Sequence, residues 1–198
     1  MTINVNARME LIWTRVRISA PPPKKEVTLK LQTGDIILSS KESIIVKFMR
    51  LFQKDPVFWG HVFIAKDSEF AWEAGRKLQE INIKKKLDKE PYWKIIRKID
   101  LTEEQKNIMR KVAPHLIGRS FGIFRIFLQL LDHVSGTNWF TNQSDNKYLQ
   151  VCSSYVAWIY WVACGYKFNG VSWQSCDPDD IEDNQMVNPD VWEIVTTY

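Results

Sequence analysis

Apolar and polar residues alternate along several short stretches of the chain, and this alternation predicts β-strands. The predicted strands cover residues 27–31, 35–39, 61–65, 69–74, 78–83, 93–99 and 191–196. A turn at Thr33-Gly34 separates the first two, and Pro91 precedes the strand that begins at residue 93. Most of the predicted strands therefore lie in the first half of the chain.

Apolar residues recur at helical spacing in four other segments, at residues 44–52, 103–116, 121–133 and 152–164. Thr102 and Gln105 form a capping box for the second of these helices, and Pro114 is expected to bend or end it. Gly165 follows the last helix as its C′ residue, and Pro178 opens a further helical turn. Strands that come first and helices that come later predict an α+β fold, with an antiparallel sheet packed against helices.

The chain is expected to form one domain over residues 27–198, preceded by an arm over residues 1–26. Residues 12–18 of the arm alternate as in a strand with one basic face, and Pro21-Pro22-Pro23 forms a stiff linker. The arm is expected to dock on the domain or on a protein partner.

The charge and the lengths of the apolar runs exclude several classes of function. A net charge of +4 is mild, and Lys and Arg are spread along the 198 residues, so nucleic acid is not an expected partner. The densest basic run, Lys84-Lys85-Lys86, is interpreted as a solvated face or loop. The longest uncharged apolar run, residues 156–165, is too short to span a bilayer. The N-terminus has no signal-peptide pattern, so synthesis in the cytoplasm is expected.

The three cysteines form neither a disulfide scaffold nor a zinc motif, so we expect no metal and no cofactor. Cys152 begins a strongly apolar predicted helix, where unpaired N–H groups and the helix dipole lower a thiol pKa and stabilise an oxyanion. Its alternative role is that of a small buried apolar residue. Cys164 lies at a helix C-terminus, where the dipole opposes a thiolate, and Cys176 lies in a polar loop.

His61 opens an apolar strand after Gly60, and Glu73 lies inside the next apolar strand. If a hairpin joins these strands, the two side chains face each other across the pair, as a base and its orienting group do. The alternatives are a hydrogen-bonded core histidine and an ion pair of Glu73 with Arg76 or Lys77. His115 and His133 lie near helix ends among polar residues, where a surface role is expected.

The order of these motifs resembles that of a known family. Gly34-Asp35-Ile36-Ile37-Leu38 comes first, then His61-Val62-Phe63-Ile64, then Glu73-Ala74, then Cys152-Ser153, and Asp177-Pro178-Asp179-Asp180-Ile181 comes last. The same order is similar to that of the circularly permuted branch of the NlpC/P60 superfamily, which comprises the YiiX-like and lecithin:retinol acyltransferase-like papain-fold enzymes. The resemblance covers about residues 27–196. The pair Ser153-Ser154 departs from the Ser-Glu or Ser-Gln that often follows the family's cysteine.

The resemblance implies a papain-like cysteine hydrolase with Cys152 as nucleophile, His61 as base and Glu73 as the third residue. Glu at the third position resembles the YiiX-like members more than the acyltransferase-like ones. The expected reaction is cleavage of an amide bond through an acyl-enzyme, with cell-wall peptide (peptidoglycan) as the first substrate hypothesis. Without a signal peptide, such an enzyme is expected to be carried by a phage particle or released by lysis.

Two other functions remain open at this stage. The first keeps the chemistry but acts on a lipid ester or N-acyl amide, as a lipid acyl hydrolase or acyltransferase, because residues 121–127 are apolar enough to contact a membrane surface. The second is a non-catalytic structural component, for example of a phage particle, whose arm over residues 1–26 adds a strand to a partner.

Overall fold

The computed structural model describes residues 30–40, 59–75, 77–118, 152–174 and 176–197. Three predictions lie outside these residues: the arm and linker at 1–26, the helix at 44–52 and the helix at 121–133. The same holds for residues 27–29 of the first predicted strand, and residues 30–31 are not in a strand. All other predicted elements fall within the described part of the chain.

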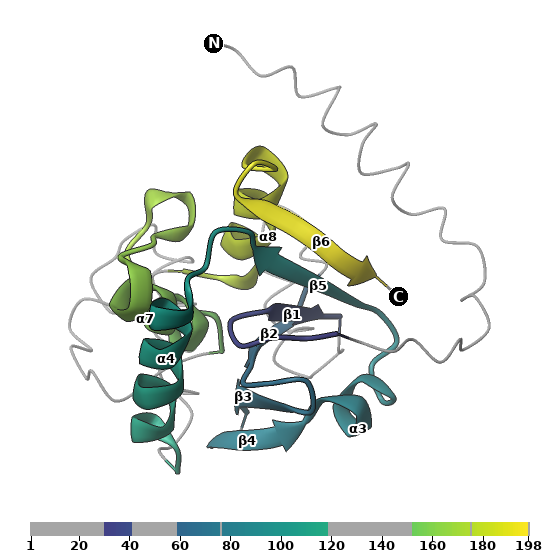
Figure 1. The fold of residues 1–198 in the computed structure, drawn as a ribbon. Coiled ribbons are helices and arrows are strands. Elements are labelled where there is room, and N and C mark those ends of the chain that lie inside the picture. The colour runs from purple at the N-terminus through teal and green to yellow at the C-terminus, as the bar shows by residue number, and fades with distance from the viewer. Residues whose placement is uncertain (1–29, 41–58, 76, 119–151, 175, 198) are drawn as a thin grey trace, which may run out of the picture.

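The described strands form one six-stranded sheet in which every neighbouring pair is antiparallel. The order across the sheet is β4-β3-β2-β1-β5-β6 (Figure 1). The strands are β1 (Ile36–Ser39), β2 (His61–Ala65), β3 (Phe70–Ala74), β4 (Leu78–Asn82), β5 (Trp93–Lys98) and β6 (Trp192–Thr197). The alternating pattern thus predicted these six strands to within about a residue or two at each end, and the antiparallel α+β fold is confirmed.

The helices are α3 (Ile83–Leu87), α4 (Glu103–Val112), α7 (Cys152–Cys164) and α8 (Pro178–Val187), with 3₁₀ turns η1 (Ala113–Leu116) and η2 (Phe168–Gly170). Thr102 caps α4 through the predicted capping box with Gln105. Pro114 lies in the 3₁₀ turn that ends this helix, as predicted. Gly165 follows α7 with φ = 67°, a backbone conformation that glycine adopts without steric cost.

The sheet is covered on both faces (Figure 1). Helix α7 packs on one face with α4 beside it, over a cluster that includes Ile36, Leu38, Val62 and Ile64. On the other face Ile37, Phe63, Ala65 and Ala71 pack with two residues of α3, Ile83 and Leu87. Burial on both faces explains why β1, in the middle of the sheet, is a continuous apolar run rather than an alternating one.

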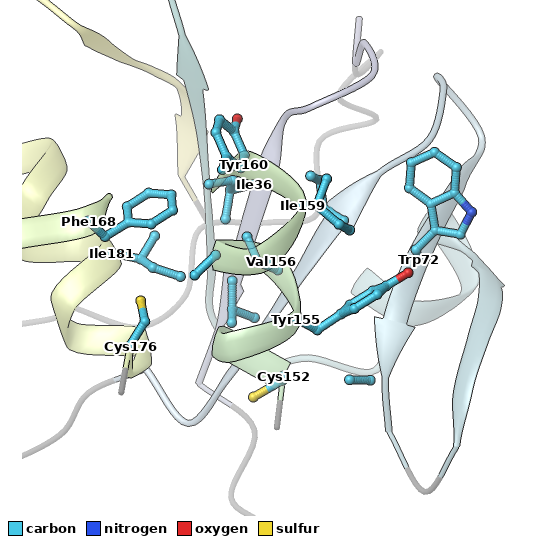
Figure 2. Close-up of a cluster of buried hydrophobic side chains, with 14 of the residues drawn as sticks. Ile36, Trp72, Cys152, Tyr155, Val156, Ile159, Tyr160, Phe168, Cys176 and Ile181 are labelled. Carbon is cyan, nitrogen blue, oxygen red and sulfur yellow. The ribbon is translucent and has the colours of Figure 1, made fainter. Parts of the chain in front are cut away.

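Two tyrosine hydroxyls fix α7 against the rest of the domain. The Tyr155 hydroxyl donates a hydrogen bond to the carbonyl of Ala113 at 3.0 Å, and the Tyr160 hydroxyl donates one to the carbonyl of Gly34. Both side chains are buried in the apolar cluster under the helix (Figure 2). Because buried hydroxyls need a partner, these bonds hold α7 in one position along the sheet.

A buried ion pair holds the start of β1. The Asp35 side chain is fully buried, and the Arg97 guanidinium on β5 donates to both of its oxygens, at 2.7 and 2.8 Å. Asp35 also accepts the N–H of Gln32 at 2.9 Å, and Arg97 also donates to the carbonyl of Lys30. The aspartate of the Gly-Asp motif therefore joins the turn before β1 to a neighbouring strand.

Replacing Asp35 with Ala should lower the free energy of unfolding by about 3 kcal/mol, because the partly exposed Arg97 loses two hydrogen bonds to the carboxylate and the N–H of Gln32 loses its acceptor. Denaturant unfolding followed by circular dichroism measures this change. Glu80→Ala is the control, since the Lys66–Glu80 pair is 37% exposed on each side and should contribute less than about 1 kcal/mol. Equal losses in the two variants would show that Asp35 has no special structural role.

Candidate functional site

Cys152 is the first residue of α7, as its sequence context predicted. The residue is 8% exposed and belongs to the apolar cluster that lies under α7. Figure 2 shows the Cys152 side chain at the end of α7 where the helix begins. The backbone N–H groups of Val62 and Ser153 hydrogen-bond to the sulfur. The thiol therefore lies among donors that stabilise a negative charge.

His61 is the first residue of β2, next to the start of α7, and its side chain is 15% exposed. Its Nε2 atom lies 2.7 Å from Oε1 of Glu73. The ring also hydrogen-bonds to the thiol of Cys152, and since Glu73 occupies Nε2, Nδ1 is the nitrogen left for the sulfur. The three predicted site residues therefore form one chain of hydrogen bonds, from thiol to imidazole to carboxylate.

Glu73 lies on β3 with its side chain 5% exposed. Three neighbours satisfy its oxygens: Oε1 accepts from His61 and from the Lys86 ammonium, and Oε2 accepts from the Gln79 amide at 3.2 Å. Among the described residues the cation beside Glu73 is Lys86 and not Lys77, which was one of the two alternatives in the sequence. The other alternative, Arg76, lies outside the described residues.

The pKa values of Cys152 and His61 are shifted in the directions that a thiolate–imidazolium pair requires. Burial raises the pKa of the Cys152 thiol, but the charge of His61, its hydrogen bond and the two backbone N–H groups outweigh burial and lower this pKa. Burial likewise lowers the pKa of His61, but the charge and hydrogen bond of Cys152, followed by those of Glu73, raise it to about 9. Together these two shifts favour transfer of the thiol proton to the imidazole.

The carboxylate of Glu73 stays ionised over the same pH range. Burial raises its pKa, but the hydrogen bonds and charges of His61 and Lys86 outweigh burial and lower the pKa to about 2. An ionised carboxylate next to an imidazole fixes the orientation of the ring and stabilises its protonated form. The sequence predicted that Glu73 and His61 face each other across two adjacent strands, and the structure places the two side chains in hydrogen-bonding contact.

The site residues come from both sides of the sheet and meet at the end of β2. Alternation along β2 points Val62 toward α7 and Phe63 toward α3, and the His61 ring lies 6.0 Å from the Phe63 ring. Glu73 and Lys86 also lie on the α3 side, where the Lys86 ammonium is 5.8 Å from the Phe63 ring. Because His61 opens its strand, its ring can reach the sulfur at the start of α7.

The other two cysteines lack these features. Cys164, at the far end of α7, donates to the carbonyl of Tyr160 at 3.1 Å, and burial raises its pKa. Cys176 was predicted in a polar loop, but it is 2% exposed and packs in the main apolar cluster. Burial raises the pKa of Cys176 well above that of a free thiol. His115 is exposed on η1, as expected, and His133 lies outside the described residues.

Sequence reasoning missed two residues of the site, Lys86 and Gln79. Residues 84–86 were interpreted as a solvated face or loop, but they belong to α3, and the Lys86 side chain is only 18% exposed. The available signal was the spacing of Ile83 and Leu87, which are four residues apart and both buried. A helix of one turn gives too few apolar positions for this spacing to be recognised.

The site does not fit a metal ion. Within the described ranges, no three His, Cys, Asp or Glu side chains are grouped closely enough to hold one. In addition, Nε2 of His61 and Oε1 of Glu73 are joined by a hydrogen bond, and the Lys86 cation next to them disfavours the binding of a metal cation. In that same part of the chain no helix is long and apolar enough to cross a membrane.

The comparisons with known proteins bear on the fold of the chain. No protein-family model matches the chain, and no curated protein matches its sequence. Among solved structures, the chain is similar to YiiX from Escherichia coli O157:H7, described as a metalloprotein of DUF1105. The TM-score is 0.54 and the identity 19%, and the match covers 71% of this chain and 70% of YiiX.

At this identity the likeness concerns the fold. YiiX belongs to the permuted, NlpC/P60-like group whose motif order the sequence resembles. The description of YiiX as a metalloprotein applies to YiiX. The described residues of this chain include no group of His, Cys, Asp and Glu side chains that could hold a metal ion. The resemblance deduced from motif order is confirmed in three dimensions: the chain has a YiiX-like α+β fold.

Proposed function

We propose that the protein is a papain-like cysteine hydrolase in which Cys152 is the nucleophile, His61 the general acid and base, and Glu73 the group that orients His61. The observation that carries this proposal is the hydrogen-bonded chain from the Cys152 thiol through His61 to Glu73, at the first turn of α7. An ion-paired thiolate is a nucleophile at neutral pH, and a buried apolar cysteine is not. The YiiX-like fold supports the same assignment.

The geometry supports an acyl-enzyme mechanism. The Cys152 thiolate attacks the carbonyl carbon of an amide, and the oxyanion that forms lies near the N–H groups of the first turn of α7, which have no partner within the helix. The His61 imidazolium gives its proton to the leaving amine as the C–N bond breaks, which leaves a thioester on Cys152. A water molecule then loses a proton to His61 and attacks the thioester, which releases the acid and restores the thiolate.

We propose an amide bond of cell-wall peptide as the substrate. The proposal rests on the resemblance of the motif order to the NlpC/P60 superfamily, and a net charge of +4 is compatible with an anionic wall polymer. The lipid alternative rested on residues 121–127, which lie outside the described part of the chain, as does the arm of the structural alternative. No described residue favours either of them over the wall substrate.

Digestion of muropeptides with purified variants tests the reaction. Wild-type protein should release cleaved peptide, and Cys152→Ala should release at least about a thousandfold less, because loss of the nucleophile removes the covalent route. Cys164→Ala is the matched control, since it removes a thiol from the other end of the same helix and should keep nearly full activity. Equal product from wild type and Cys152→Ala would exclude Cys152 from the mechanism.

Alkylation with iodoacetamide at pH 6 tests the thiolate independently of any substrate. Cys152 should be labelled stoichiometrically while Cys164 and Cys176 stay largely unlabelled, because the pKa is lowered at the first and raised at the other two. His61→Ala should slow the labelling of Cys152 by about tenfold or more, since the thiol loses the cation that ionises it. Mass spectrometry of tryptic peptides assigns the label, and similar labelling of all three cysteines would contradict an activated Cys152.

Glu73→Gln tests the orienting group. The substitution removes a negative charge from the imidazolium, so the pKa of His61 should fall from about 9 by about one unit or more. NMR of histidine-labelled protein measures this pKa, and the chain has only three histidines, so His61→Ala identifies the signal. An unchanged His61 pKa in the folded variant would show that Glu73 does not stabilise the imidazolium.

A further inference from the structure

Lys86 is held in place by the short helix that carries it. Asn82 caps α3 by accepting the N–H of Lys85 at 3.0 Å, and Ile83 and Leu87 anchor the helix in the apolar cluster on this face of the sheet. The Lys86 side chain is 18% exposed, and its ammonium contacts Oε1 of Glu73. The neighbouring Lys84 is 80% exposed on the same helix. Lys86 alone of this basic run is therefore directed at the candidate site.

A second buried carboxylate lies behind Lys86. The Glu90 side chain is fully buried, and its Oε1 lies 3.8 Å from the Lys86 ammonium. Within the residues that the structure describes, neither oxygen of Glu90 has a hydrogen-bond partner. A buried carboxylate without hydrogen bonds is costly, so the nearby cation compensates its charge. Lys86 thus lies between Glu73, which contacts His61, and Glu90, which does not.

One oxygen atom of Glu73 is shared by two cations. Oε1 accepts from His61 at 2.7 Å and also from Lys86. A carboxylate that is partly neutralised by one cation attracts a second cation less strongly. Among the described residues, the charged and titratable groups that face this part of the site are Glu73 on β3, His61 on β2, Cys152 on α7, and Lys86 and Glu90 at and after α3. The attraction between Glu73 and the imidazolium therefore depends on Lys86 and, through Lys86, on Glu90.

We propose that Lys86 is a positioning residue that aims Glu73 at His61 and limits how firmly this carboxylate holds the His61 proton. The proposal rests on the proposed function, in which His61 must release that proton to the leaving amine and later take one from water. A proton held too firmly slows the first transfer, because a general acid works best when its pKa is near the working pH. The negative charge of Glu90 offsets part of the electrostatic effect of Lys86 on Glu73.

The test is the His61 pKa, measured by histidine NMR in a series of charge variants. Lys86→Met should raise it by about half a unit or more, since Glu73 then acts on His61 with its full charge. Glu90→Gln should lower it, because Lys86 then acts on Glu73 alone. Lys86→Arg should keep it near the wild-type value. Lys84→Met, on the same helix, should leave it unchanged.

Turnover separates positioning from simple support of the fold. Lys86→Met should lower kcat at neutral pH several-fold with a much smaller change in KM, and Lys86→Arg should restore most of it. If Lys86→Met does not fold because Glu90 loses its cation, Lys86→Met with Glu90→Gln is compared with Glu90→Gln alone. The added loss of Lys86 should still raise the His61 pKa.

The outcomes distinguish this inference from the proposed function. A His61 pKa near its ordinary value in the wild-type protein would remove the thiolate–imidazolium pair, and with it the proposed hydrolase. A raised pKa in the wild type that stays the same or falls in folded Lys86→Met would leave the hydrolase standing and overturn the role of Lys86. A raised pKa in both Lys86→Met and Lys84→Met would show a general effect of basic charge and also overturn it.

Discussion

The chemistry of the site depends on one constraint, the position of the first turn of α7 relative to the first residues of β2. The N–H of Val62 and the ring of His61 both reach the sulfur of Cys152, so a shift of α7 by one residue would break both contacts at once. Two buried tyrosine hydroxyls and the apolar cluster under the helix prevent such a shift. Packing that has no chemical role of its own therefore determines whether a thiolate can form.

The two ends of the central strand pair, β1 and β2, have different roles, one structural and one at the candidate site. Asp35 precedes β1, at the end where β1 pairs with the last residues of β2. The Asp35 carboxylate accepts hydrogen bonds from Arg97 and from a backbone N–H. At the other end Ser39 pairs with His61, where the candidate site begins. The buried carboxylates of Asp35 and Glu73 each pair with a cation. Glu73 also contacts the imidazole ring of His61.

Much of the fold followed from the sequence because its local signals are strong. Strand β2 has the predicted bounds, and the capping box at Thr102 and the glycine after α7 mark helix ends that the structure confirms. The thiol, the imidazole and the carboxylate could be chosen because each stands out against an apolar segment. Lys86 could not, because a one-turn helix has no period to detect and because basic runs are usually solvated. Cys176 lies in a loop, as predicted, but its burial could not be foreseen because polar neighbours along the chain do not indicate packing by distant residues.

The separation of the site across the sheet has a consequence for how such a protein can change over time. The proposed nucleophile, Cys152, belongs to the layer formed by α7, whereas Glu73, Lys86 and Glu90 belong to the layer under α3. Substitutions in the second layer can adjust proton affinity while the surface that surrounds the sulfur keeps its shape. Divergence in acidity preference and divergence in substrate choice can therefore proceed independently, in different parts of one small domain.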